Sequence, residues 1–105
     1  MYVAIYRWKL KHGTEEAFAG YWSEGTLLFR SEQRAWGSRL HRGDDGTYFA
    51  YAQWPDRELY HSKKNLSPRH TENLTKMREC IEESFPVIMG EVTHDLLLQK
   101  SVNGS

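Results

Sequence analysis

The five histidines are the residues whose type first suggests chemistry, because an imidazole can bind a metal ion or exchange a proton near neutral pH. They are His12, His41, His61, His70 and His94. No two of them have the spacing at which one helix face or one strand presents a pair of metal ligands, and there is only one cysteine. The sequence therefore predicts no metal site. Most of these histidines are expected at the surface or partly buried, but His41, on a predicted strand, could point into a cavity.

Motifs for nucleophilic catalysis and phosphate binding are missing from the sequence as well. There is no Gly-x-Ser-x-Gly nucleophile elbow. Cys80 falls within a predicted helix, far from the helix N-terminus that would favour a thiolate, and is expected to serve as a small hydrophobic residue. Gly43 and Gly46 belong to a predicted hairpin and lack the following helix that a phosphate-binding loop requires.

Aromatic side chains are the more informative set. The 105 residues include four Trp, six Tyr and four Phe. Trp and Tyr combine a large apolar surface with a polar atom that needs a partner when buried, so they suit ligand cavities as well as cores. Tyr6 and Trp8 on a first strand and Trp54 on a third are predicted to share a face, with Tyr60 at its mouth. These rings either form a flat slot for a planar aromatic ligand or fill the core, and their spacing leaves both possibilities open.

Charge and length exclude several classes of protein. Fourteen basic and 14 acidic residues give a formal net charge of zero, whereas nucleic-acid and membrane-surface binders carry an excess of positive charge. The longest apolar run, residues 1–6, is too short to span a bilayer, and a single cysteine cannot form an internal disulfide. We expect a soluble cytoplasmic protein with no nucleic-acid or membrane partner. Its length predicts a single domain over 1–105, with a core of about 2–98 and a polar tail over 99–105.

The hydrophobic pattern predicts six main elements. Alternation with period two, as at Tyr6, Trp8 and Leu10, indicates strands, and apolar residues three or four apart indicate helices. The predicted strands cover residues 2–11, 36–42, 47–54 and 91–99. The predicted helices run from Thr14 to about 34 and from Ser67 to about 85, with a short helical turn over 57–63. The Gly-Asp-Asp-Gly sequence at 43–46 predicts a hairpin between the second and third strands.

This order, βαββαβ, predicts an α+β, ferredoxin-like fold in which two helices cover one face of a four-stranded antiparallel sheet. The other face would present Val3, Ile5, Phe49 and Tyr51, which are too apolar to stay in water. We therefore expect a homodimer formed through this open sheet face.

The same segments resemble the antibiotic biosynthesis monooxygenase family of dimeric α/β barrels. Residues 2–18, an apolar strand that turns basic and aromatic and ends at Gly before Thr-Glu-Glu-Ala-Phe, resemble its first strand and helix start. Leu-His-Arg at 40–42, the Asp-Asp-Gly turn and Tyr-Ala-Gln-Trp at 51–54 resemble its central hairpin, and Ser-Pro-Arg at 67–69 resembles the start of its last helix. The resemblance covers about residues 2–98 and implies subunits that pair sheet to sheet.

The resemblance also implies an activity and a site. The best-understood members of the family oxidise polycyclic phenols or anthrones to quinones with O2 and no flavin, haem or metal, so no cofactor is expected. A Trp and a Tyr that contact substrate in the family match Trp54 and Tyr60, and Tyr6 and Trp8 would add to the same cavity. The family's strand Asn and helix Arg fall on Ala50 and Leu74, so this chain lacks two polar groups proposed to act on the substrate. Arg69 and Arg78 lie about one turn from the lost Arg.

Two functions follow as expectations. The first is cofactor-independent oxidation of a phenolic, hydroquinone or anthrone-like aromatic, with His41 or His70 as general base and Trp54 and Tyr60 binding substrate. The alternative is a dimeric protein that binds a small aromatic metabolite without turnover. An open cavity lined by Trp54 and Tyr60 would favour either of them over a purely structural role.

Overall fold

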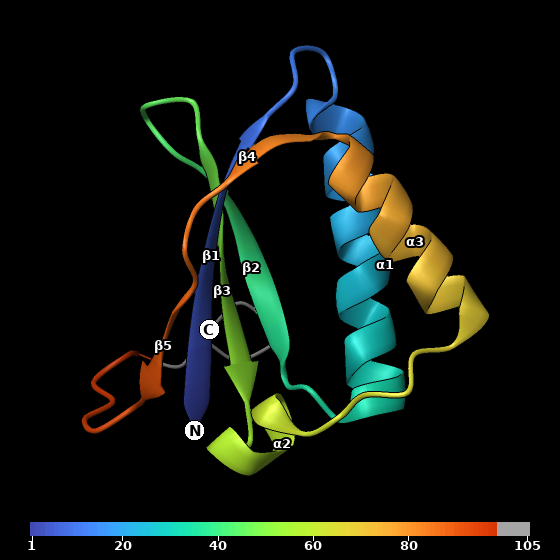
Figure 1. Ribbon diagram of the computed structural model, residues 1–105. Helices are drawn as coiled ribbons and strands as arrows, with labels where there is room; N and C mark the ends of the chain where they lie inside the picture. The colour runs from blue at the N-terminus through green and yellow to red at the C-terminus, as the bar shows by residue number, and fades with distance from the viewer. Residues whose placement is uncertain (99–105) are drawn as a thin grey trace.

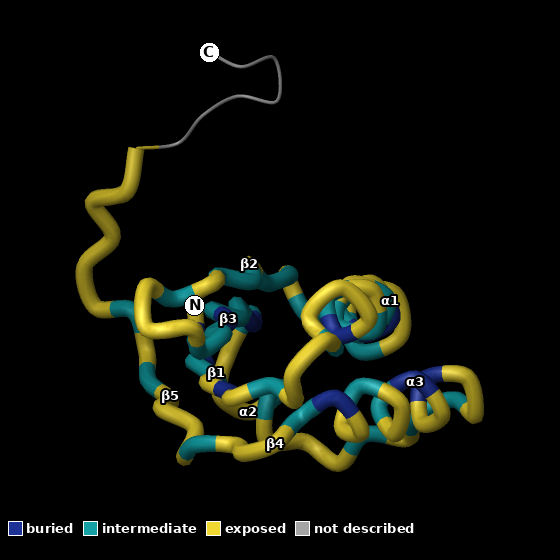
Figure 2. The backbone as a smooth tube through the Cα atoms, turned by 90° about the horizontal axis from the view of Figure 1, so that it is seen from above, coloured by how far each residue is buried: buried dark blue, intermediate teal, exposed yellow. Residues whose placement is uncertain are grey.

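In the computed structural model, which describes residues 1–98, one antiparallel sheet faces a pair of helices (Figure 1). The strands are β1 (Tyr2–Leu10), β2 (Gly37–Arg42), β3 (Tyr48–Trp54), β4 (Ile81–Ser84) and β5 (Ile88–Glu91). The helices are α1 (Glu15–Gln33), α2 (Arg57–His61) and α3 (Pro68–Glu79). Seen from above, the sheet forms one layer and α1 and α3 form a second (Figure 2). This arrangement confirms the predicted α+β, ferredoxin-like fold; the predicted polar tail, 99–105, lies outside the described residues.

The sheet is open and has β1 near its centre. Its order is β2-β3-β1-β4, and β5 pairs with β1 on the same side as β4. All of these pairings are antiparallel. Because β4 pairs with the end of β1 and β5 with its start, the two short strands together occupy the place of the predicted fourth strand.

The last part of the described chain differs from the prediction. The spacing of Leu74, Met77 and Ile81 predicted a helix to about residue 85 and a last strand over 91–99. Instead α3 ends at Glu79, β4 and β5 pair with β1, and residues 92–98 contain no strand. The Phe85 amide also donates to the Arg7 carbonyl at 3.0 Å, so the edge is interrupted only around Pro86, which has no N–H to donate. Backbone pairing with β1 therefore overrides a side-chain spacing that would have continued the helix.

The two sheet faces divide the aromatic residues as their alternation predicted. Tyr2, Trp8, Ala50 and Trp54 are buried on the face toward the helices, and the register pairs their strands directly. The core joins Trp8 and Ala50 with Phe18 of α1 and with Cys80, which is buried as expected although it follows α3 rather than lying within it. The opposite face carries the other residues of each strand. In the described part of the chain, no helix is long and apolar enough to cross a membrane.

Helices α1 and α3 pack closely against each other at Gly25. A Cβ atom added there would lie 3.3 Å from Asn73 Nδ2, a contact tighter than most real ones. The same Asn73 Nδ2 donates to the Tyr21 carbonyl of α1 at 2.8 Å, and both Gly25 and Asn73 are buried. The absence of a side chain at Gly25 thus lets one buried amide join the helices that cover the sheet.

We expect Asn73→Ala to lower the free energy of unfolding by about 1–2 kcal/mol, because it removes a buried interhelical hydrogen bond. Urea unfolding followed by circular dichroism would measure the change. Thr71→Ala, an exposed position on the same helix, is the control and should change stability far less. Equal effects of the two substitutions would contradict the role given to Asn73.

Candidate functional site

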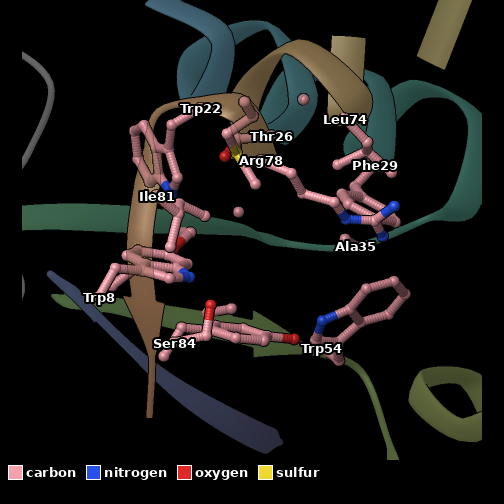
Figure 3. Close-up of a pocket in the computed structure, with 17 residues that line it drawn as sticks. Trp8, Trp22, Thr26, Phe29, Ala35, Trp54, Leu74, Arg78, Ile81 and Ser84 are labelled. Atoms are coloured by element: carbon pink, nitrogen blue, oxygen red, sulfur yellow. The ribbon is translucent and has the colours of Figure 1, made fainter. Parts of the chain in front are cut away.

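A cavity of about 310 Å³ lies between the sheet and the helices α1 and α3 (Figure 3). This is near the lower end of the range of roughly 300–1,000 Å³ for small-molecule sites. Its lining residues come from every strand but β5, from both long helices and from the loop before β2. They are Tyr6, Trp8, Trp22, Gly25, Thr26, Phe29, Ala35, Gly37, Ser38, Ala50, Ala52, Trp54, Leu74, Met77, Arg78, Ile81 and Ser84. The core is therefore not completely filled by aromatic rings.

Small residues between large rings create the cavity. Ala50 and Ala52 occupy the middle of β3 and add little volume to the sheet face, while Trp8 and Trp54 lie toward opposite ends of the space (Figure 3). Trp22 and Phe29 line it from α1. Because flat indole and phenyl surfaces flank a floor of methyl groups, the space suits a planar apolar ligand.

Tyr6 brings a phenol to this cavity. Its ring lies parallel to that of Trp8, with centroids 5.9 Å apart, and its Oη is 2.9 Å from the Tyr60 Oη. Burial, followed by the hydrogen bond to Tyr60, raises the pKa of Tyr6 well above its usual value. Tyr6 therefore stays a neutral phenol that can donate a hydrogen bond, and it cannot serve as a base near neutral pH.

Tyr60 lies behind the cavity wall and does not line it. Its ring packs edge-on against Trp54, with centroids 5.6 Å apart. Tyr6 is thus the phenol that reaches the cavity, and Tyr60 supports it from α2. Of the four residues expected to bind substrate, the structure brings Tyr6, Trp8 and Trp54 to the cavity directly and Tyr60 through Tyr6.

Lys64 fixes the position of this supporting group. Its Nζ donates to the carbonyls of Leu59 and Ser62, at 3.2 and 3.1 Å, and also to that of Tyr60. The same ammonium lies 4.8 Å from the centre of the Trp54 ring, within reach of a cation–π interaction. Burial lowers the pKa of Lys64. Lys64 therefore ties the end of α2 to Trp54.

The expected placement of His41 is wrong. The β2–β3 register pairs Leu40 with Ala50 and His41 with Phe49, so Leu40 shares the helix-facing side and His41 lies on the open face. There its ring stacks on that of Phe49, with centroids 4.6 Å apart. Because successive strand residues point to opposite faces, His41 cannot reach the cavity from this position.

His70 is buried but is separated from the cavity by Phe29. Its imidazole is fully buried between α1 and α3, and its ring centroid lies 4.3 Å from that of Phe29. Its Nδ1 is 3.7 Å from Glu32 Oε1, and neither ring nitrogen has a hydrogen-bond partner among the described residues. Since His70 does not line the cavity, the structure gives neither expected base a direct contact with a ligand there.

The burial of His70 predicts that stability falls on acidification. Desolvation lowers the pKa of His70 below its ordinary value of 6.5, and the nearby Glu32 carboxylate only partly opposes this. The unfolded chain therefore binds more protons than the folded chain below about pH 6.5, and stability decreases as the pH falls through that range. We expect His70→Gln to weaken this dependence in urea unfolding at pH 7.5 and 5.5. The control, His12→Asn at an exposed position, should retain it, and an unchanged pH dependence in His70→Gln would contradict the assignment.

The polar groups of the cavity are few. Besides Tyr6, they are the hydroxyls of Thr26, Ser38 and Ser84, the indole N–H groups, and the Arg78 guanidinium. Ala50 and Leu74, which stand where the resembled family has Asn and Arg, both line the cavity, so these two positions are apolar here. Arg78, one turn beyond Leu74, brings a cation to the same space. Arg69 instead pairs with Glu24 on the outer side of the helices.

Sequence reasoning missed Ser38 and the side of β2 that faces the helices. The signal was available in the alternation of Ser38, Leu40 and Arg42, once the hairpin places them on the same face as Ala50. Trp22 and Phe29 fall within the helix predicted from Thr14 to about 34, but they are not among the predicted site residues. Their spacing of seven residues places them on one face of α1, toward the sheet.

Within residues 1–98 no three His, Cys, Asp or Glu side chains gather in a way that could hold a metal ion.

Comparison with solved structures identifies the same fold in several proteins. A Bordetella bronchiseptica protein named as a candidate antibiotic biosynthesis monooxygenase has 19% sequence identity and a TM-score of 0.73 over 89% of this chain and 97% of its own. SnoaB from Streptomyces nogalater, a cofactor-independent oxygenase, has 17% identity and a TM-score of 0.71 over 90% of this chain and 95% of its own. A candidate monooxygenase of the same name from Chloroflexus aurantiacus has 14% identity and a TM-score of 0.73 over 90% and 94% of the two chains.

These likenesses confirm that the chain resembles the antibiotic biosynthesis monooxygenases in fold. No protein-family model and no curated protein matches the sequence. At such low identity these comparisons show a shared fold, and the chemistry of the cavity decides the activity.

Proposed function

We propose that the protein is a cofactor-independent monooxygenase that oxidises a phenolic, hydroquinone or anthrone-like aromatic with O2. The observation that carries this proposal is a cavity with tryptophan walls, a floor of Ala50 and Ala52, and the neutral phenol of Tyr6 facing it. The shared fold with SnoaB, a cofactor-independent oxygenase, supports the same reaction class.

The reaction requires a substrate that supplies its own electrons. An anthrone loses one C–H proton to give an anion, the anion transfers one electron to O2, and the two radicals combine through a new C–O bond. Protonation of the product gives a hydroperoxide. Its O–O bond then breaks as the second C–H proton is lost, one oxygen remains as a carbonyl, and the other leaves as hydroxide and is protonated to water. One CH2 group and one O2 thus become one C=O group and one water.

The protein's part in this reaction is to hold negative charge in a cavity whose lining is mainly apolar. If Tyr60 donates to Tyr6, the Tyr6 hydroxyl proton is free to bond to the substrate oxygen on which charge accumulates. The Tyr60 hydrogen bond polarises Tyr6 and strengthens this interaction. Trp54, held by Lys64, would stack on the substrate ring. These interactions are stronger in an apolar cavity than in water.

Oxygen consumption tests the proposed function. Purified protein with a chelator present is expected to consume O2 in proportion to added substrate when a panel of hydroquinones and anthrones is tested in an oxygen electrode. Uptake that requires an added metal or flavin would contradict the cofactor-independent mechanism. If no member of the panel is consumed while one of them still raises the Tm, the enzyme proposal is rejected.

The second candidate function is binding of a small aromatic metabolite without turnover. It is favoured by Ala50 and Leu74, which leave the cavity without the two polar side chains that the resembled family places there. A binding protein would raise its Tm with the ligand and leave the O2 concentration unchanged. The oxygen electrode and a thermal shift with the same compounds therefore separate the two functions.

We also propose that the chain forms a homodimer through the open face of its sheet. Val3, Ile5, Phe49 and Tyr51 lie on this face and are only partly buried by the rest of the chain, and Ile88 at the β5 edge is 67% exposed. A second copy would remove these side chains from water. Sedimentation at micromolar concentration should give about twice the chain mass of 12.4 kDa, and a 12.4 kDa species would contradict the dimer.

A further inference from the structure

The ionisable groups of the cavity are unusual for a site that must create an anion. Of the described residues that line it, none is Asp, Glu, His or Lys, and Arg78 is the one with a charge. The phenol of Tyr6 has a raised pKa, and the Thr26, Ser38 and Ser84 hydroxyls are not bases near neutral pH. The lining can therefore donate hydrogen bonds to an anion but has no group suited to remove a proton from a neutral ligand.

Arg78 supplies the positive charge in the right place for such an anion. It stands in the last turn of α3, and its side chain extends into the space between α3 and the sheet (Figure 3). The other cations of this helix are paired: Arg69 with Glu24, and Lys76 with Glu72 at 3.3 Å. Among the described residues, no carboxylate pairs with Arg78. Arg78 is also exposed to solvent, so its guanidinium borders both water and the cavity and is free to pair with a ligand anion there.

Ser38 is a second group without a partner. Its Oγ is buried and has no hydrogen-bond partner among the described residues, although it belongs to the cavity lining. Buried hydroxyls nearly always bond to something. A ligand oxygen in the cavity is one partner that would satisfy it.

We infer that the cavity binds its aromatic ligand as an anion already formed in solution, with the Arg78 guanidinium as its counter-charge. The bound ligand is an aryl oxide or an enolate. It is the anion of a planar phenol, naphthol or enolisable ketone that is acidic enough to lose its proton to water before it binds. Binding of the anion does not depend on the proposed function. Only the oxygenation that follows binding rests on that function. The first proton of the oxygenation is then released outside the protein, so no base is needed at the site.

A coloured probe tests this directly. The visible absorption of 4-nitro-1-naphthol changes when it ionises, so its pKa can be measured free and in the presence of saturating protein. If the anion binds at least tenfold more tightly than the neutral naphthol, the pKa of the bound probe falls by about one unit or more. A bound pKa equal to or higher than the free value overturns the inference, and so does a failure of the probe to bind at millimolar protein.

Two matched variants assign the effect to Arg78. Arg78→Gln is expected to remove most of the pKa shift, and Arg78→Lys should keep part of it because the charge remains while the planar hydrogen-bonding fork is lost. Arg69→Gln, on the same helix but outside the cavity, should keep the full shift. An equal shift in wild type and Arg78→Gln would overturn the role of Arg78. Because no oxygen is consumed in this titration, its outcome is independent of whether the protein is an oxygenase.

Discussion

Replacing Ala52 by leucine is expected to reduce kcat/KM for O2-dependent oxidation of an aromatic substrate by at least about 100-fold, equivalent to about 2.7 kcal/mol. Ala52 lies in the centre of β3, between Ala4 and Ser38 of the neighbouring strands, and its methyl group forms part of the cavity floor. A leucine side chain would project into the space that the substrate ring needs. The strand itself accepts leucine, because the added atoms enter a cavity and not a packed core.

Ala17→Leu provides the matched control, because Ala17 is exposed on α1 and lies outside the cavity. Steady-state oxygen uptake would be measured for both variants, and circular dichroism would show that both remain folded. We expect wild-type rates for Ala17→Leu. Undiminished turnover in a folded Ala52→Leu protein would place the reaction somewhere other than this cavity.

The second large effect is expected for Tyr6→Phe, which should lower kcat by about 100-fold. Tyr6 is the phenol that lines the cavity, and the loss of one donor to a developing oxyanion typically costs about 100- to 1,000-fold in rate. Tyr60→Phe keeps the Tyr6 hydroxyl and removes only its 2.9 Å partner, so its effect should be smaller. We therefore expect kcat to be highest for wild type, lower for Tyr60→Phe and lowest for Tyr6→Phe.

Tyr48→Phe controls for the loss of a phenol in general. Tyr48 lies on the helix-facing side of β3, opposite Trp8 of β1, but does not line the cavity. We expect it to retain wild-type kcat. If Tyr60→Phe lost more activity than Tyr6→Phe, the phenol in contact with the substrate would be Tyr60, as the family resemblance alone implied, and the assignment of Tyr6 would be wrong.

The faces of the central strands could be predicted from the sequence because a strand alternates its side chains strictly. Once Tyr6, Trp8 and Trp54 were placed on one face, their meeting beneath the helices followed from the pairing of β1 with β3. The end of α3 could not be predicted in this way. Helical spacing of apolar residues continues to Ile81, and only the unpaired edge of β1, a feature of the folded sheet, draws residues 81–84 into a strand.

The candidate site was predictable in its aromatic part and not in its polar part. The rings are identified by strand periodicity, but the orientation of His41 depends on the hairpin register between β2 and β3. His70 was expected as a possible general base, but it does not line the cavity, and Phe29 of α1 packs against its ring from the cavity side. The sequence does not show which of Arg69 and Arg78 reaches the cavity. The packing of α3 on α1 decides this, because it pairs Arg69 with Glu24 and leaves Arg78 in the cavity lining.

Isotopic labelling of the product tests the central claim most directly. Wild-type protein, Ala52→Leu and Ala17→Leu would each be incubated under 18O2 with an anthrone that the wild type consumes, and the product would be analysed by mass spectrometry. The proposed mechanism predicts one 18O atom in each quinone and one O2 consumed per substrate. In the same incubation time, wild type and Ala17→Leu should form far more labelled product than Ala52→Leu. Product without 18O, or equal labelled product from Ala52→Leu, would contradict oxygenation in the cavity between the sheet and the helices.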